Sequence, residues 1–140
     1  QWKHKKGSVT YNDSYTWIER EINSSFPAKY EARAYTFDAF ANYEITTEFS
    51  TMVGLNGNFS SFNSFSIPFG GTDFNQDVSD ETAKFEIIDP YLNLLYISKY
   101  GLNVNAGVRL NIHSDYGNHF VYNINPSYNF DFGKQNLKFF

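Results

Sequence analysis

Apolar and polar residues alternate one by one over most of this chain. In residues 102–112 an apolar set starts at Leu102 and a polar set starts at Asn103, each recurring at every second position. Residues 119–130 repeat the pattern. In a β-strand, successive side chains point to opposite faces, so a period of two is the signature of a strand with unlike faces. The alternation therefore predicts a sheet with one apolar face and one amide-rich face.

The same test predicts six long strands and one short strand. They are expected at about 8–22, 30–45, 48–59, 85–97, 101–112 and 119–130, with a stub from residue 136. Asp13 falls on the apolar face of the first strand and weakens that assignment. Strands of soluble domains usually run about 5 to 6 residues, whereas a tilted strand that crosses a membrane needs about 9 to 11. Strand length therefore favours a membrane barrel.

The connectors between these strands alternate between long and short. The longer ones are 23–29, 60–84 and 113–118, and the shorter ones are 46–47, 98–100 and 131–135. Bacterial outer-membrane barrels have this arrangement, with tight turns on the periplasmic side and longer loops outside. The residues expected at the turn side include aromatic side chains that would form a girdle there: Tyr43, Phe49, Tyr96, Tyr100, Tyr128 and Phe130.

Composition narrows the class of protein. Aromatic residues make up 20% of the 140 residues, which suits strands near an interface between apolar and wet surroundings. A net charge of -4 argues against a nucleic-acid partner, and we interpret the basic cluster at residues 3–6 as a solvated chain end. No cysteine is present, which excludes disulfides and thiolate metal sites. No run of about 18 apolar residues exists, which excludes a transmembrane helix.

Alternation alone does not separate a membrane barrel from a soluble all-β module that holds a hydrophobic ligand between its sheets. The polar face is dominated by Asn, Ser, Thr and Gly rather than by Lys and Glu, which favours a wet but weakly charged lumen over a solvent-facing surface. We therefore predict one all-β domain over residues 1–140: an antiparallel meander of about seven strands, a fragment of a transmembrane β-barrel.

Residues 101–130 resemble the barrel of TonB-dependent outer-membrane receptors. The matching features are an Ala-Gly-x-Arg pattern at Ala106 to Arg109, a short acidic loop at Ser114 to Asn118, and Pro-Ser-Tyr at Pro126 to Tyr128. Within that family the chain looks most like the cobalamin transporters of Bacteroidetes-type receptors. The resemblance implies a location in the bacterial cell outer membrane. It also implies the uptake of a nutrient, cobalamin or a metal chelate such as a siderophore, with TonB as partner.

The chain also departs from that family. Its receptors have a 22-stranded barrel filled by an N-terminal plug domain, and neither the plug nor a TonB-binding segment is recognisable here. About seven strands and a last strand that stops soon after Asn136 predict a fragment. Isolated, its two open strand edges would lead to self-association. The alternative is a complete eight-stranded barrel that ends on an aromatic residue, Phe140, but the final stub is too short to span.

The predicted loops supply ligand-contact candidates. These are Asp73, Asn75, Asp77, Glu81, Asp115 and Tyr116. In the loop 60–84, oxygen-bearing side chains recur at every second residue, which is reminiscent of a calcium loop: Asp73, Asn75, Asp77, Ser79 and Glu81. The possible calcium ligands among them are Asp73, Asp77 and Glu81. However, Val78 and Lys84 stand where an EF-hand needs glycine and glutamate. We favour a solvated acidic loop over calcium, and we expect no other cofactor.

The polar face supplies a second set of candidates, which would line the lumen. They are Arg109, Asn103, Asn105, Asn123 and Asn125. Acidic residues of a plug, or water, would satisfy Arg109 there, whereas in lipid at mid-depth an arginine costs about 2 to 4 kcal/mol. His113, Asp115 and His119 are interpreted as loop hydrogen-bonding residues. No Gly-x-Ser-x-Gly motif and no cysteine nucleophile is present, and we predict that the chain is not an enzyme.

Overall fold

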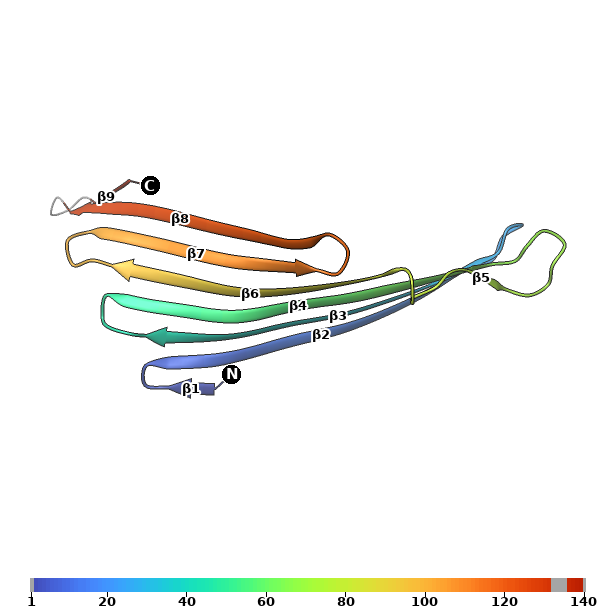
Figure 1. The fold of residues 1–140 in the computed structure, drawn as a ribbon, viewed down its shortest axis with the longest axis horizontal. Helices are drawn as coiled ribbons and strands as arrows, with labels where there is room; N and C mark the ends of the chain where they lie inside the picture. The colour runs from blue at the N-terminus through green and yellow to red at the C-terminus, as the bar shows by residue number, and fades with distance from the viewer. Residues whose placement is uncertain (1, 132–135, 140) are drawn as a thin grey trace.

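The computed structural model describes residues 2–131 and 136–139, and these form strands and connectors without a helix. The strands are β1 (Trp2–His4), β2 (Gly7–Ile22), β3 (Ala28–Glu44), β4 (Phe49–Ser66), β5 (Asn75–Val78), β6 (Lys84–Ile97), β7 (Leu102–His113), β8 (Gly117–Asp131) and β9 (Asn136–Phe139). They make one antiparallel sheet in the order β1-β2-β3-β4-β6-β7-β8-β9, with β5 paired to β4 (Figure 1). The predicted all-β meander is confirmed.

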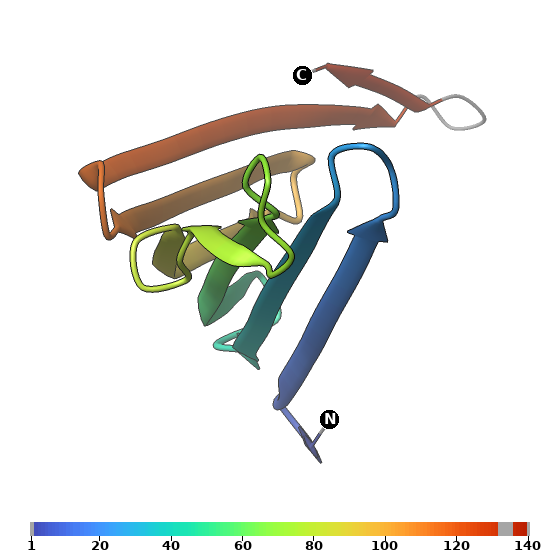
Figure 2. The same cartoon turned by 90° about the vertical axis from the view of Figure 1, so that its right-hand side faces the viewer.

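The sheet is curled into a half-barrel. Figure 2 shows the strands following a curve from β2 at one side to β8 at the other. Right-handed strand twist accumulates from strand to strand, and this bends a sheet of long strands toward closure. Among the described residues β1 pairs only with Gly7 to Val9 of β2, and β9 pairs only with the last residues of β8. For residues 2–131 and 136–139, most of the outer edge of β2 and of β8 is therefore unpaired.

The strand register keeps two kinds of side chain apart. One row of directly paired residues crosses six strands and is apolar: Val9, Ala41, Val53, Leu92, Val108 and Tyr122. The row one residue away is polar apart from Met52: Ser8, Asn42, Met52, Asn93, Gly107 and Asn123. We call the sides that carry these rows the apolar face and the polar face. They carry the two residue sets that the alternation predicts.

The polar face is the more enclosed of the two, and the apolar face is open. On β6, Asp89 is only 6% exposed and Asn93 is half-buried on the polar face, whereas Leu92 on the apolar face is exposed. No hydrophobic side chain of the described residues is buried. The sheet therefore curls around its polar face, and its apolar residues do not build a core within this chain.

The long connector predicted at 60–84 is wrong in its first part. β4 continues to Ser66, because the strand keeps pairing with β3 as far as Ala28, and β5 adds to its other edge. The alternation fails there because Ser60 and Ser61 stand side by side, while Phe62 and Phe65 fall on opposite faces. The true connector between β4 and β6 is 67–83. Residues 132–135 of the last predicted connector lie outside the described residues.

This connector is fastened to β4 by a buried amide. Asn63 is 7% exposed, and its Oδ1 accepts hydrogen bonds from Gln76 Nε2 at 2.9 Å and from the backbone N–H of Asp80 at 2.6 Å. Ser66 Oγ also donates to Asp77 at 3.0 Å. Two donors on the connector thus depend on one acceptor on the strand.

Over the part of the chain that the structure describes, no helix is long and apolar enough to cross a membrane.

Replacing Asn63 with Ala should free the connector from β4. The change leaves two donors without their acceptor, at a cost of about 1 to 3 kcal/mol. Hydrogen–deuterium exchange should then become faster at residues 76–80 and stay unchanged in β7. The control is Asn118→Ala, because Asn118 is exposed and its side chain makes no hydrogen bond to the described residues. Equal exchange in both variants would contradict the anchoring role.

Candidate functional site

A charged cluster lies on the polar face across β6 and β7. Arg109 Nη1 is 3.7 Å from Oδ2 of Asp89, whose side chain is 8% exposed. Asn111 Nδ2 donates to the other oxygen of Asp89 at 2.6 Å. An enclosed carboxylate is tolerated when it is both paired and hydrogen-bonded, as here. The acid beside Arg109 therefore comes from the neighbouring strand. Half of the Arg109 side chain is still exposed, so its contact with water or with the acidic residues of a plug stays a prediction.

Tyr91 extends this cluster across a third strand and onto a fourth. Its ring lies 5.6 Å from Arg109 Cζ, and its hydroxyl donates to Asp38 Oδ1 on β3 at 3.0 Å. To reach β3 the ring crosses β4 at Gly54, the residue directly opposite in the register. A Cβ at Gly54 would fall on the atoms of the ring. The missing side chain at this position makes the four-strand network sterically feasible.

Amide side chains continue the polar face toward the end of the sheet that carries the short turns, which we call the turn end; the opposite end is the loop end. Asn93 Nδ2 donates to Asn105 Oδ1 at 2.8 Å. Asn123 packs over Gly107, which lies between Asn123 and Asn93 in the register. Asn125 is the direct partner of Asn105, and Asn103 lies two residues further along β7. Amides present donors and acceptors without net charge, so this wall can hydrogen-bond neutral polar solutes or water. The structure thus gathers all the predicted polar-face residues on one surface.

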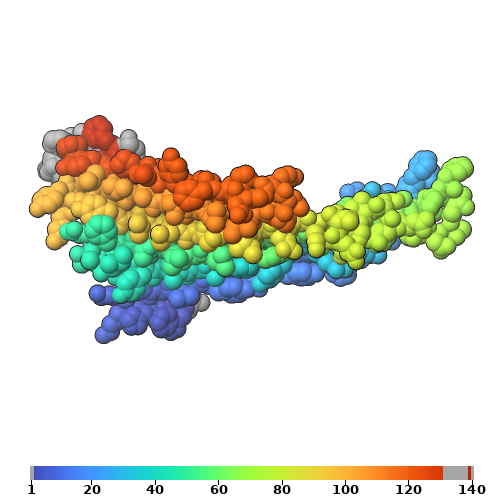
Figure 3. All heavy atoms as spheres, viewed as in Figure 1, coloured from blue at the N-terminus to red at the C-terminus, as the bar shows by residue number. Residues whose placement is uncertain are grey.

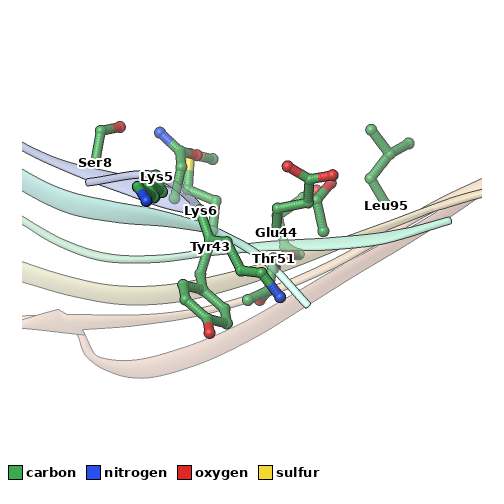
Figure 4. Close-up of a pocket in the computed structure, with 12 residues that line it drawn as sticks. Lys5, Lys6, Ser8, Tyr43, Glu44, Thr51 and Leu95 are labelled. Atoms are coloured by element: carbon green, nitrogen blue, oxygen red, sulfur yellow. Dashed lines mark hydrogen bonds between the residues drawn. The ribbon is translucent and has the colours of Figure 1, made fainter. Parts of the chain in front are cut away.

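Three open hollows lie on this surface. One, of about 530 Å³, is lined by members of the cluster, including Asp38, Tyr91 and Arg109. A second, of about 740 Å³, is lined by the predicted amides Asn103, Asn105 and Asn125 among others. The third, of about 490 Å³, lies at the turn end and is lined by Lys5 and Glu44 among others. In Figure 4, Ser8 and Leu95 extend to one side of the sheet, while the Tyr43 ring lies on the other. None of the three is an enclosed pocket, as expected of a wall that is open on one side.

The predicted loop residues are not brought together. Asp73 accepts from Thr72 at 3.2 Å, and Asp77 is held by Ser66 on β4, while Asn75 pairs with Ser66 and Glu81 lies in the turn that begins at Ser79. Within residues 2–131 and 136–139, no group of three or more His, Asp or Glu side chains is placed to hold a metal ion. Calcium therefore stays a prediction that the geometry does not support.

The loop between β7 and β8 forms a local cluster around His113. Its Nδ1 accepts from the backbone N–H of Asp115 at 3.0 Å, and its ring lies 4.6 Å from that of Tyr116. His119 pairs with Asn111, away from this loop cluster. Asp115 and Tyr116 thus shape the turn. Sequence reasoning missed Asp80, which lies 3.9 Å from Arg33, because only the folded connector brings the two charges together.

Aromatic rings border the apolar face at both ends of the sheet. At the turn end, Phe49 lies 4.6 Å from Tyr96, and Tyr128 lies 4.4 Å from Phe130. Toward the loop end, three rings form a second band. Tyr35 lies 6.3 Å from Phe59, and its hydroxyl is 2.9 Å from that of Tyr11. Between the two bands the apolar face carries aliphatic residues together with the rings of Phe37, Phe120 and Tyr122, and Asp13 interrupts it on β2. The sequence predicted the first band and missed the second.

Beyond the second band the apolar face becomes charged. Lys29 Nζ lies 2.9 Å from Glu31 and 3.3 Å from Glu19, both on that face. The hydrogen bonds to Glu31 and Glu19 raise the pKa of Lys29 above its usual value. Paired charges of this kind are suited to water and not to an apolar medium. Toward the loop end, the exposed apolar surface therefore ends where these charged residues begin.

Comparisons of the chain with protein families, with curated proteins and with solved structures find no match. The function has to be argued from the geometry described above.

Replacing Gly54 with Ala should destabilise the sheet by about 1 to 3 kcal/mol, because the new Cβ overlaps the Tyr91 ring. The same change in a Tyr91→Ala background should cost much less, since the ring is gone. Thermal unfolding of the four proteins of this double-mutant cycle measures the coupling. If the two costs simply add, the contact between Gly54 and Tyr91 does not hold the network.

Proposed function

We propose that this sheet is part of the wall of a bacterial outer-membrane barrel, with its apolar face in lipid and its polar face lining an aqueous lumen. The observation that carries the proposal is the exposed apolar belt between two aromatic bands. Phe49 and Phe59 mark the bands ten residues apart on β4. At about 3.3 Å per residue and a strand tilt of about 40°, the belt is roughly 25 Å tall. Outer-membrane barrels expose a belt of about that height.

The soluble alternative receives less support. A soluble sandwich or lipocalin-like barrel buries its apolar face as a core. Here Val53 and Tyr122 are 53% and 70% exposed, and no apolar side chain of the described residues is buried. Water would face an apolar surface that spans six strands. A surface of that size is favourable only when lipid or protein covers it.

A small complete barrel is also disfavoured by the geometry. In a closed barrel the first and last strands pair with each other. Among the described residues, β1 pairs only with β2 and β9 pairs only with β8, so the sheet stays an open half-barrel. An open curved sheet is the shape expected of part of the wall of a larger barrel.

Among larger barrels, we propose a TonB-dependent receptor for nutrient uptake, such as cobalamin or a metal chelate. The support is the resemblance of residues 101–130, together with a lumen wall that is mostly amide and carries one ion pair. In such a receptor the wall shapes the passage, and TonB supplies energy through a plug that occupies the lumen. The partners would be outer-membrane lipid, the plug, TonB and the nutrient. We propose no catalytic role and no cofactor.

An introduced arginine should destabilise the protein more on the apolar face than on the polar face. Val108→Arg places a charge in the middle of the belt and should cost about 2 to 4 kcal/mol of folding free energy in lipid bilayers. Asn105→Arg on the same strand should cost less than about 1 kcal/mol, because its charge would face the lumen, as that of Arg109 does. Reversible unfolding of protein reconstituted in vesicles measures both. Equal costs would contradict the assignment of the faces.

Solubility tests the membrane assignment independently of the faces. Purified without detergent, the chain should aggregate, because both the belt and the strand edges lie open to water. Adding detergent should restore a monodisperse species with the same β-sheet content. Size-exclusion chromatography with light scattering, together with circular dichroism, distinguishes the two states. A folded monomer in plain buffer would rule out the proposed function.

A further inference from the structure

Three strands extend past the rest of the sheet at its loop end. Figure 1 shows β2, β3 and β4 running beyond the ends of β7 and β8, and the space-filling view shows the same extension (Figure 3). We call residues 16–22, 28–34 and 60–66 the tip. They pair with one another in unbroken antiparallel register. The two faces of the tip therefore continue the two faces of the belt.

The polarity of the two faces is reversed in the tip. The face that continues the apolar belt now carries the charges: Glu19, Glu21, Lys29, Glu31 and Arg33. The face that continues the polar side carries mainly apolar residues: Ile18, Ile22, Ala28, Tyr30, Ala32, Ala34 and Phe62. Where the sheet extends beyond the belt into water, charged residues on its outer side are favourable. Exposure to water does not explain why the inner side is apolar.

Arg20 is the one charged residue on this inner side of the tip. It pairs in register with Tyr30, and it forms no ion pair or hydrogen bond with the described residues through its side chain. The charged residues of the outer side are treated differently, since Lys29 and Arg33 both have carboxylate partners. An arginine on an apolar surface has five donors to satisfy. The inner side of the tip thus offers a cation without an anion.

Two aromatic rings lie on the same side of the tip as this arginine. Tyr30 and Phe62 are stacked, with ring centroids 6.1 Å apart and planes at 20°. Phe62 is 37% exposed, and Ile18, in the same register row but separated from it by Ala32 of β3, is 58% exposed. The Tyr30 hydroxyl has no hydrogen-bond partner among the described residues. Exposed rings can stack against the ring of a ligand, while a neighbouring guanidinium group pairs with the acidic group of the same ligand.

We infer that Ile18, Arg20, Tyr30 and Phe62 form a binding site for a small anion that carries a ring. The carboxylate, sulfonate or phosphate of the ligand pairs with Arg20, and its ring covers Phe62 and Ile18. The surface spans two strand spacings, about 10 Å, which fits one or two fused rings. The inference deepens the proposed function, because it places first contact with the solute at the mouth of the proposed lumen.

The test uses 2-naphthoate as the probe and its neutral analogue 2-naphthamide as the charge control. The full chain is reconstituted in nanodiscs of zwitterionic phosphatidylcholine, and binding is measured by isothermal titration calorimetry against empty nanodiscs. We expect 2-naphthoate to bind at least about tenfold more tightly than 2-naphthamide. Arg20→Gln should remove that preference, and Phe62→Ala should weaken both ligands about fivefold.

Two variants of the outer side serve as matched controls. Arg33→Gln removes a cation from the same tip, and Phe65→Ala removes a ring from the face opposite Phe62. Both should bind 2-naphthoate as the unchanged chain does. The inference is overturned if 2-naphthoate does not bind, if the amide binds equally well, or if Arg33→Gln weakens binding as much as Arg20→Gln. Because nanodisc insertion is scored separately, a chain that inserts but does not bind contradicts this inference and leaves the proposed function standing.

Discussion

Strand register is the constraint on which the rest of this structure depends. Six strands of 12 to 18 residues are paired so that each row of side chains stays on its own side of the sheet. A slip of one residue in any strand would move all of its side chains to the opposite face. Such a slip would place Asn93 in the apolar belt and Leu92 on the polar wall. The exposed belt, the amide-rich wall and the charged cluster therefore all depend on the same backbone ladder.

The sequence predicted the elements in which alternation is strict. β7 and β8 were expected at 101–112 and 119–130 and are found at Leu102–His113 and Gly117–Asp131. Alternation failed at the end of β4, where the reason to remain a strand is pairing with β3 rather than the pattern of its own residues. β5 has four residues and depends on Asn63 and Ser66 of β4. Tertiary context, which a local pattern does not contain, decides such segments.

The charged cluster could be predicted only in part for the same reason. The alternation places Arg109 on the polar face, but its partner Asp89 is twenty residues away, and nothing local pairs them. The position of Tyr91 depends on Gly54 of β4. In the local sequence, a glycine inside a strand indicates only a lower tendency to form that strand. The Asp38 to Arg109 network arises from registers across four strands. Without those registers, the sequence does not indicate that these residues are close together.

The reversal of polarity in the tip sharpens the argument for a boundary at Tyr35 and Phe59. Strands made only to satisfy a soluble core would keep one face apolar along their whole length, because that core would continue along the sheet. In this chain the same strands change which face is apolar at one level, and the aromatic residues Tyr35 on β3 and Phe59 on β4 mark that level. A change of medium outside the sheet accounts for the outer face, since charges replace apolar residues where lipid would end. The inner face needs a separate cause, because in the proposed barrel water would fill the lumen on both sides of that level. A ligand that meets the wall above the belt supplies that cause.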